Sequence, residues 1–238
     1  MRFRIPDFCI SKQPDDTTCG PTCLHSVLNY YGDETSLSQI ISEVPDLETG
    51  GTLSVMLANY ALKKGYKATT YTYNLQLFDP TWFRKGTDIA AKLREQAKFK
   101  SKDKLQVATR HYLEYLKLGG RLMFEDMSPF LIRKILRAGT PIICGLSSTY
   151  LYTAKREYGP NCDDDDIRGV PSGHFVVIYG YDAKRRKVFI ADPLLPNPQS
   201  QGQLYSVSVS HLICAILLGV LTYDAKLLII EPKENGER

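Results

Sequence analysis

Apolar side chains recur with a helical period through most of the first half of the chain. Leu24, Val27, Leu28 and Tyr31 follow one another at spacings of three or four residues, so we expect an amphipathic helix here. Similar patterns predict further helices over residues 37–44, 53–64, 88–100 and 105–118. Another helix should begin after Ser128, with its inner face formed by Phe130, Leu131, Ile135 and Leu136.

Short apolar runs replace this period in the second half. Strands are predicted at residues 66–73, 121–124, 141–146, 175–181, 187–191 and 225–230. The apolar stretch Leu212–Leu221 is about half as long as a bilayer crossing requires, so we expect a buried helix there and no membrane span. Helices followed by strands are the order of an α+β fold.

The composition indicates a folded domain without an obvious charged partner. The chain has 238 residues, of which 43% are hydrophobic, and this supports a packed core. A net charge of +4 is too small to indicate nucleic acid. The cations of residues 84–110 fit a solvated helix face better than a phosphate-binding patch. The N-terminal residues lack the apolar run of a signal peptide, so we expect a cytoplasmic protein with six free cysteines.

Residues 16–24 place a thiol at the start of the first helix. Pro21 fits the first helical turn, where its missing N–H costs nothing. The free N–H groups and the positive end of the helix dipole favour a thiolate at Cys19. The competing interpretation, a buried structural thiol, suits Cys23 better because it lies among apolar residues. The two thiols are too far apart for a Cys-x-x-Cys redox motif, and no second Cys/His pair lies nearby to complete a zinc site.

Three further residues could complete a site for acyl transfer with Cys19. His174 opens an apolar strand and should lie at a sheet edge facing a loop, and Asp192 follows the next strand. An imidazole with a carboxylate partner can act as base for a thiol, and the amide of Gln13 could donate to an oxyanion. The ordinary interpretations are a structural histidine, an aspartate in a strand-ending turn and a surface glutamine. Asp182 is the competing carboxylate, but its context is that of a turn.

No motif indicates a metal ion or an organic cofactor. The run Asp163–Asp166 could attract calcium, but contiguous carboxylates cannot all face one ion, and the spacing of an EF-hand is absent. We expect a solvated loop instead. Gly50-Gly51 and Gly119-Gly120 lack the strand-to-helix context of phosphate-binding loops.

Three blocks of the sequence together resemble the bacteriocin-processing, double-glycine-leader cysteine peptidases. The blocks are Gln13 to Leu24 followed by Asn29-Tyr-Tyr-Gly32, then Gly173 to Asp182, and then Phe189-Ile-Ala-Asp192-Pro193. The resemblance implies a papain-like cysteine peptidase fold, with an N-terminal helical half carrying the nucleophile helix and a C-terminal antiparallel sheet carrying His and Asp. It also implies a role for each site residue: Cys19 as nucleophile, His174 as base, Asp192 as orienting residue and Gln13 as oxyanion residue.

The resemblance further implies a peptide or protein as substrate. We expect one papain-like domain over residues 1–238 with a helical insertion at 66–127, acting either as a flap that limits access to the cleft or as a packing addition. The transporter and ATPase segments that often follow such a domain have no counterpart here, so we expect a stand-alone peptidase. The alternatives are a transpeptidase or amidase on small thiol or peptide-like substrates, and a non-catalytic peptide-binding module.

Overall fold

A mostly antiparallel sheet forms the centre of the molecule. In the computed structural model, which describes residues 2–48 and 50–233, eight strands join in this sheet. Seven follow the order β3-β2-β10-β4-β7-β8-β9, and β1 pairs with β7. Strands β2 and β3 run parallel, and the other pairs are antiparallel. The strands are β1 Arg2–Arg4, β2 Lys67–Thr72, β3 Arg121–Met123, β4 Ile142–Ser147, β7 Gly173–Asp182, β8 Lys187–Ala191, β9 Leu204–Ser208 and β10 Lys226–Glu231, with β5 Glu157–Tyr158 and β6 Asp163–Asp164 in a separate hairpin.

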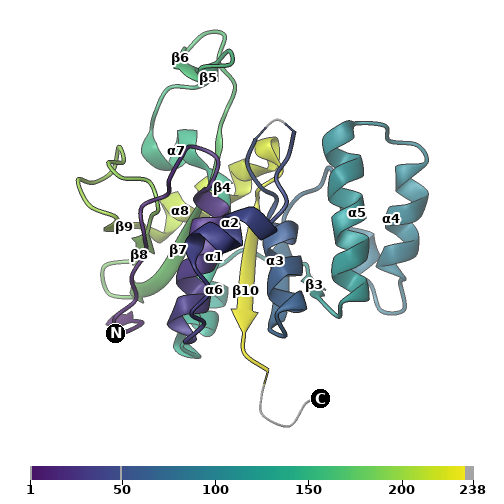
Figure 1. Ribbon diagram of the computed structural model, residues 1–238, viewed down its shortest axis with the longest axis horizontal. Coiled ribbons are helices and arrows are strands. Elements are labelled where there is room, and N and C mark those ends of the chain that lie inside the picture. The colour runs from purple at the N-terminus through teal and green to yellow at the C-terminus, as the bar shows by residue number, and fades with distance from the viewer. Residues whose placement is uncertain (1, 49, 234–238) are drawn as a thin grey trace.

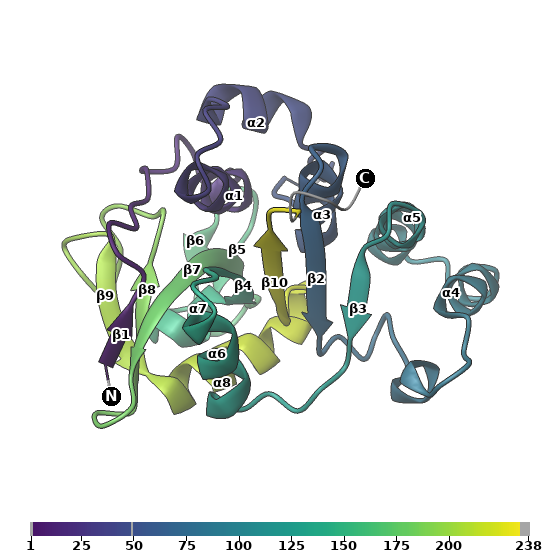
Figure 2. The ribbon, with the colours of Figure 1, turned by 90° about the horizontal axis from the view of Figure 1, so that it is seen from below.

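Helices cover both faces of the sheet. Figure 2 shows α1, α2 and α3 on one face, α6 and α8 on the other, and α4 and α5 beyond the β3 edge. The core lies between the sheet and these helices, where α1 packs on β7 and α8 packs on β4. The helices are α1 Cys19–Tyr30, α2 Leu37–Glu43, α3 Ser54–Lys63, α4 Ile89–Ala97, α5 Asp103–Lys117, α6 Pro129–Arg137, α7 Ser148–Tyr152 and α8 Val209–Leu218, with short 3-10 turns η1 Pro80–Phe83 and η2 Gly219–Thr222.

The first turn of α1 packs closely on β7 because it carries a glycine. A Cβ added at Gly20 would lie 3.3 Å from the ring of Phe175, so a larger residue would push helix and strand apart. One turn later, the thiol of Cys23 donates to the carbonyl oxygen of Phe175 at 3.3 Å. Cys23 is fully buried, which confirms its predicted place in the core. These contacts bring the start of α1 beside the start of β7.

Strand β7 lies inside the sheet, with β4 on one side and β8 on the other. Its apolar residues face helices on both sides of the sheet, which explains the unbroken apolar run. The expectation of a sheet edge is therefore wrong for the strand as a whole. However, β8 ends at Ala191, opposite Val177. His174 lies beyond that last pair, next to the segment that follows β8.

Most predicted elements are confirmed, with a few exceptions. Ser128 caps α6 through a hydrogen bond from Leu131 N at 3.2 Å, but Phe130 is 67% exposed instead of buried. The stretch Leu212–Leu221 is helical to Leu218, yet it is only partly buried, since Leu217, Leu218 and Leu221 are exposed. Helix α7 and strand β9 were not predicted. Helix α7 has a local signal that the sequence analysis did not use, since Ser147 caps it through a hydrogen bond from Tyr150 N.

The segment 66–127 contributes both to the sheet and to a pair of helices at its edge. Strand β2 pairs with β10 and β3 pairs with β2, so both ends of the segment belong to the sheet. Between them, α4 packs on α5 and α5 packs on α3. The hydroxyl of Tyr115 ties α5 to both strands, with bonds of 2.9 Å to Ala68 O and 2.8 Å to Arg121 O. Figures 1 and 2 show α3 between these helices and α1.

Candidate active site

Helix α1 begins at Cys19, and its first N–H groups have no side-chain cap. Thr18 is the N-cap residue, but its hydroxyl bonds to the backbone of Asp15 and makes no capping bond. Pro21 has no N–H to satisfy. The N–H groups at the start of a helix have no partner within the helix and favour an anion. The thiol of Cys19 therefore lies where negative charge is stabilised.

His174 and Asp192 form a buried hydrogen-bonded pair. The Nε2 of His174 lies 2.9 Å from the Oδ1 of Asp192. Asp192 is 0% exposed and His174 is buried as well. A carboxylate accepts hydrogen bonds, so Nε2 carries the proton of this bond and Nδ1 is left for a different partner. The pair therefore fixes both the orientation of the ring and the role of each nitrogen.

Three other donors surround the carboxylate of Asp192. The hydroxyls of Tyr152 and Tyr205 donate to its Oδ2 at 2.8 and 2.7 Å. The backbone N–H of Leu194 donates to Oδ1 at 3.0 Å. The two tyrosines come from α7 and β9 and were not predicted, because neither stands in a motif. A buried carboxylate needs such a set of donors to remain charged.

These contacts keep Asp192 ionised and His174 protonated. Burial alone raises the pKa of Asp192, but hydrogen bonds from His174, Tyr205 and Tyr152 and the charge of His174 lower it below its usual value. Burial alone lowers the pKa of His174, but hydrogen bonds to Asp192 and Cys19, with the charges of both, raise it to about 10. Burial and the nearby carboxylate raise the pKa of both tyrosine hydroxyls, which therefore remain donors.

The sulfur of Cys19 lies near enough to His174 to help raise the pKa of its ring. Because Nε2 is taken by Asp192, Nδ1 is the nitrogen available to the sulfur. An imidazolium next to a sulfur favours the thiolate, which is the reactive form of cysteine. The structure therefore places Cys19, His174 and Asp192 in one continuous chain of contacts.

Gln13 lies next to this chain of contacts. Its backbone N–H donates to the carbonyl oxygen of Pro193 at 2.9 Å, which anchors it beside the residue that follows Asp192. Gln13 is 5% exposed, so the interpretation as a surface glutamine is wrong. Its Nε2 donates to Asp15 O at 2.8 Å. A side-chain amide has two N–H donors, and this bond uses one of them.

The remaining sequence candidates lie elsewhere. Asp182 accepts a hydrogen bond from Arg185 N at 3.0 Å and belongs to the turn between β7 and β8. Asp165 accepts bonds from the backbone of Ile167 and Arg168 within its own exposed loop. All six cysteines are free.

Two protein-family models match the chain. Residues 81–211, more than half of the chain, match the model of the Peptidase C39-like family, and residues 7–88 match that of the Peptidase C39 family. The chain belongs to the C39 family of cysteine peptidases. Peptidases of the C39 family hydrolyse peptide bonds. A comparison with curated proteins gave no match.

Solved structures share the C39 fold at low sequence identity. A protein described as a C39-like peptidase from Bacillus anthracis has a TM-score of 0.53 at 15% identity, covering 99% of this chain and 100% of that one. Xylellain, a cysteine protease from Xylella fastidiosa, has a TM-score of 0.50 at 13% identity, covering 98% and 86%. The expected α+β, papain-like fold is therefore confirmed. A double-glycine-motif protease from a transporter, solved with its leader peptide, has a TM-score of 0.44 at 13% identity, covering 98% and 99%.

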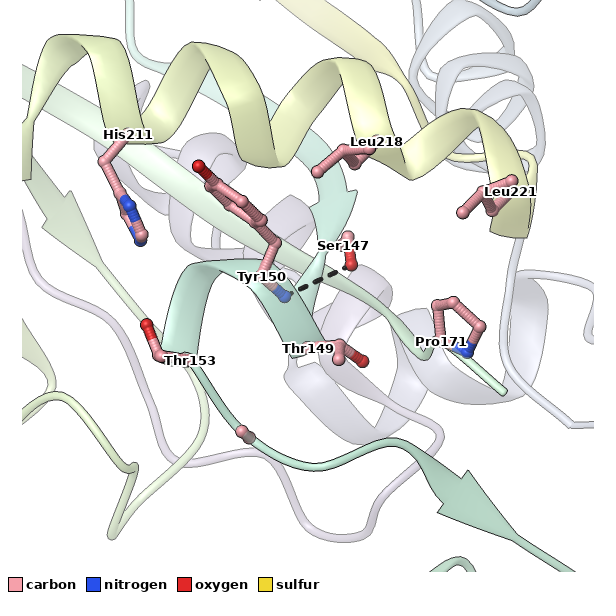
Figure 3. A pocket seen from close by; sticks show the side chains of 9 residues that line it. Ser147, Thr149, Tyr150, Thr153, Pro171, His211, Leu218 and Leu221 are labelled. Atoms are coloured by element: carbon pink, nitrogen blue, oxygen red, sulfur yellow. Dashed lines mark hydrogen bonds between the residues drawn. The ribbon is translucent and has the colours of Figure 1, made fainter. Parts of the chain in front are cut away.

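A hollow of about 460 Å³ opens between α7 and α8 of the C39 domain. Figure 3 shows Tyr150 and His211 side by side in it, with Leu218 and Leu221 on the α8 side. The rings of Tyr150 and His211 stack, with their centroids 4.9 Å apart. The lining of the hollow includes Ser147 but none of the four candidate catalytic residues. Helix α7 therefore separates the hollow from the site, since Tyr150 lines the hollow and Tyr152, two residues later, binds Asp192.

Across residues 2–48 and 50–233, no group of three or more His, Cys, Asp or Glu side chains is placed to hold a metal ion. In that part of the chain, no helix combines the length and the apolar character needed to cross a membrane.

Proposed function

We propose that this C39 peptidase cleaves a peptide bond through a Cys19–His174–Asp192 triad, with Gln13 assisting at the oxyanion. The observation that supports the proposal most strongly is the place of His174. Its ring bonds to a buried carboxylate at 2.9 Å, and the neighbouring Cys19 helps to raise its pKa. An imidazole held in this way can share its charge with a thiolate and deliver a proton to the substrate.

In the first half of the reaction, Cys19 becomes acylated. The thiolate sulfur attacks the carbonyl carbon of the scissile bond, and the carbonyl oxygen becomes an oxyanion. The imidazolium of His174 then gives its Nδ1 proton to the amide nitrogen, the C–N bond breaks, and the amine product leaves. The enzyme is left with a thioester at Cys19 and a neutral His174.

The oxyanion needs donors that already point at it. The backbone N–H of Cys19 is one, because it opens α1 and has no cap. The remaining amide N–H of Gln13 is the second, because Gln13 is buried beside the site and anchored by Pro193. Both residues are held by the fold before the substrate arrives.

In the second half, water resolves the thioester. Neutral His174 takes a proton from the water at Nδ1, and the resulting hydroxide attacks the carbonyl carbon. The C–S bond breaks, the acid product leaves, and the thiolate–imidazolium pair is restored. Asp192 remains ionised throughout and holds the ring through Nε2.

Selective alkylation tests the proposal directly. Limited iodoacetamide at pH 6, followed by peptide mapping, should label Cys19 before the exposed Cys9, Cys162 and Cys214, because the imidazolium favours its thiolate. His174→Ala should remove this selectivity, and Cys214→Ser should leave it unchanged. Equal labelling of all exposed cysteines, with Cys19 unlabelled, would contradict the triad.

Product analysis then separates hydrolysis from amide transfer. The wild-type chain, incubated with a peptide library, should generate new termini detectable by mass spectrometry, and Cys19→Ala should generate none. Addition of a competing amine distinguishes the two fates of the thioester. Free acids as the main products support a peptidase, whereas amide products in dilute amine would support a transpeptidase.

A further inference from the structure

A second buried carboxylate lies next to the His174 strand and has no part in the steps above. Asp224 is 7% exposed and stands between η2 and β10. Its backbone N–H donates to Gly219 O at 2.8 Å, and its Oδ2 accepts a hydrogen bond from the hydroxyl of Thr222 at 2.6 Å. Burying a carboxylate is costly, so its position needs an explanation.

Two glycines create the space that Asp224 fills. Gly173 immediately precedes His174, and a Cβ there would overlap the carboxylate of Asp224. On the neighbouring strand, a Cβ at Gly145 would lie 3.2 Å from the Cβ of Asp224. The carboxylate therefore stands where a side chain of residue 173 would stand, against the backbone that carries His174.

Two lysines lie against the turn that holds Asp224. Lys226 is buried, and its ammonium donates to the carbonyl oxygen of Tyr223. Lys104, from α5, donates to Thr222 O at 3.0 Å and lies 5.5 Å from the centre of the Tyr223 ring. Both lysines attract the carboxylate of Asp224. The buried charge is thus compensated from two different elements.

The segment 66–127 holds this turn at a second point. The side-chain amide of Gln76 donates to Val220 O at 3.1 Å, so Gln76 and Lys104 together fix two carbonyl groups of η2. The turn also contains Tyr223 at a φ of 72°, a conformation that non-glycine residues adopt rarely. Contacts from this segment therefore help to maintain the position of Asp224.

We infer that Asp224 is a positioning residue of the peptidase, which stabilises the imidazolium of His174 across Gly173, and that Lys104 connects the α4–α5 helices to this carboxylate. The inference rests on the proposed function, because it concerns the charge state of the proposed base. Asp192 holds the ring by a direct bond, while Asp224 acts through space and touches no substrate.

The charges around Asp224 define the pH range in which it acts. Burial raises its pKa to about 6, against the lowering effects of Thr222, Lys226, Lys104 and His174. Burial also lowers the pKa of Lys226 to about 8. The charged and titratable groups that interact with Asp224 through space are Lys226 from β10, Lys104 from α5, His174 from β7 and Cys144 from β4. Asp224 is a carboxylate above about pH 6, so its negative charge is present at neutral pH.

The direct test is a pH titration of His174 in the full chain, observed by NMR of its ring nitrogens. Asp224→Asn keeps the shape and removes the charge, so the midpoint for His174 should fall by about 0.5–1 pH unit, as expected for a nearby charge. Thr222→Val disturbs the same turn but keeps the carboxylate, so it should leave the midpoint unchanged. An unchanged midpoint in Asp224→Asn, or an equal fall in both variants, would overturn the inference.

The role of α5 has its own matched pair of variants. Lys104→Met removes the ammonium at Thr222, and Lys102→Met removes an exposed one at the start of the same helix. We expect Lys104→Met to lower kcat about threefold to tenfold with KM unchanged, the usual size of such coupling, and Lys102→Met to have no effect. Equal activities in the two variants would remove Lys104 from the inference.

Alkylation of Cys19 separates this inference from the proposed function. If Asp224→Asn leaves the His174 midpoint unchanged while Cys19 stays selectively labelled, the role of Asp224 is wrong and the triad stands. If the wild-type chain shows no selective labelling of Cys19, the proposed function fails and the inference fails with it.

Discussion

Removing the two tyrosine hydroxyls that bind Asp192 tests how much they stabilise its buried charge. Tyr152→Phe and Tyr205→Phe each delete one oxygen atom and leave the ring in place. In each single variant the other tyrosine still donates to Oδ2. A hydrogen bond to a charged group contributes about 1.5–3 kcal/mol, so each variant should lower the free energy of unfolding by about that amount. The double variant leaves Oδ2 without a tyrosine donor and should lose more than the sum.

Urea-induced unfolding at pH 7 provides the assay, and the chain offers a matched control. The hydroxyl of Tyr73 is buried and has no hydrogen-bond partner among the described residues. Tyr73→Phe therefore removes the same atom at little or no cost. If Tyr152→Phe and Tyr205→Phe cost no more than this control, Asp192 is not a charged acceptor for these hydroxyls and the reasoning is refuted.

The pH dependence gives the same prediction a second check. The pKa of Asp192 is lowered in the folded chain, so its contribution to stability is present above the ordinary aspartate value of about 3.9 and is lost as the pH falls through the lowered value. The cost of each tyrosine variant should therefore shrink below about pH 3.9. A cost that stays constant down to pH 3 would show that packing, not charge, is responsible.

Four further outcomes follow from contacts already described. Gly173→Ala places a methyl group against Asp224 and should lower the free energy of unfolding, measured in urea, by about 1–3 kcal/mol. Gly202→Ala, with nothing within 4 Å of its added Cβ, should lower it much less. Equal losses in the two variants would refute the close approach of Asp224 to Gly173. The pKa of His174 is raised to about 10, so the contribution of this residue to stability is complete below the ordinary histidine pKa of about 6.5 and is lost as the pH rises toward 10. The melting temperature of the wild type should therefore fall over that pH range, and that of His174→Gln should fall less. Gln13→Ala should lower kcat about 100-fold with KM nearly unchanged, as expected for a lost oxyanion donor, and an unchanged kcat would exclude that role. Charge reversal at Arg94, Lys98 and Lys102 should change kcat/KM for acidic and neutral peptides by less than about twofold. The reason is that α3 and α5 separate α4 from α1 (Figure 1) and that salt screens exposed charges beyond about 10 Å. A larger fall for acidic peptides at low salt would instead support substrate steering by these helices.

Residues whose place depends on local sequence could be predicted. The position of Cys19 at the start of α1 follows from the proline two residues later and the helical period behind it. His174 and Asp192 stand at the ends of apolar runs that the structure confirms as strands. Their contact follows from ordinary antiparallel pairing of β7 with β8. The chemistry of the candidate site was therefore visible in the order and context of a few residues.

Residues recruited by tertiary contacts could not be predicted in this way. Tyr152 and Tyr205 lie 40 and 13 residues from Asp192, in stretches with no period and no motif. Their role arises only when α7 and β9 fold back onto the end of β8. Phe130 shows a related limit, because a helical period identifies side chains on one face and does not show what covers that face.

The four donors of Asp192 come from separate parts of the chain, and this has a consequence for synthesis. Cys19 emerges from the ribosome early, whereas Tyr205 lies far downstream, and at about 5–20 residues per second the stretch between them takes on the order of 10–40 s to appear. For most of that interval, until His174 has been added, the nascent chain carries the thiol of Cys19 without the proposed base. Under the proposed mechanism, the complete site can therefore form only after Tyr205 has been synthesised.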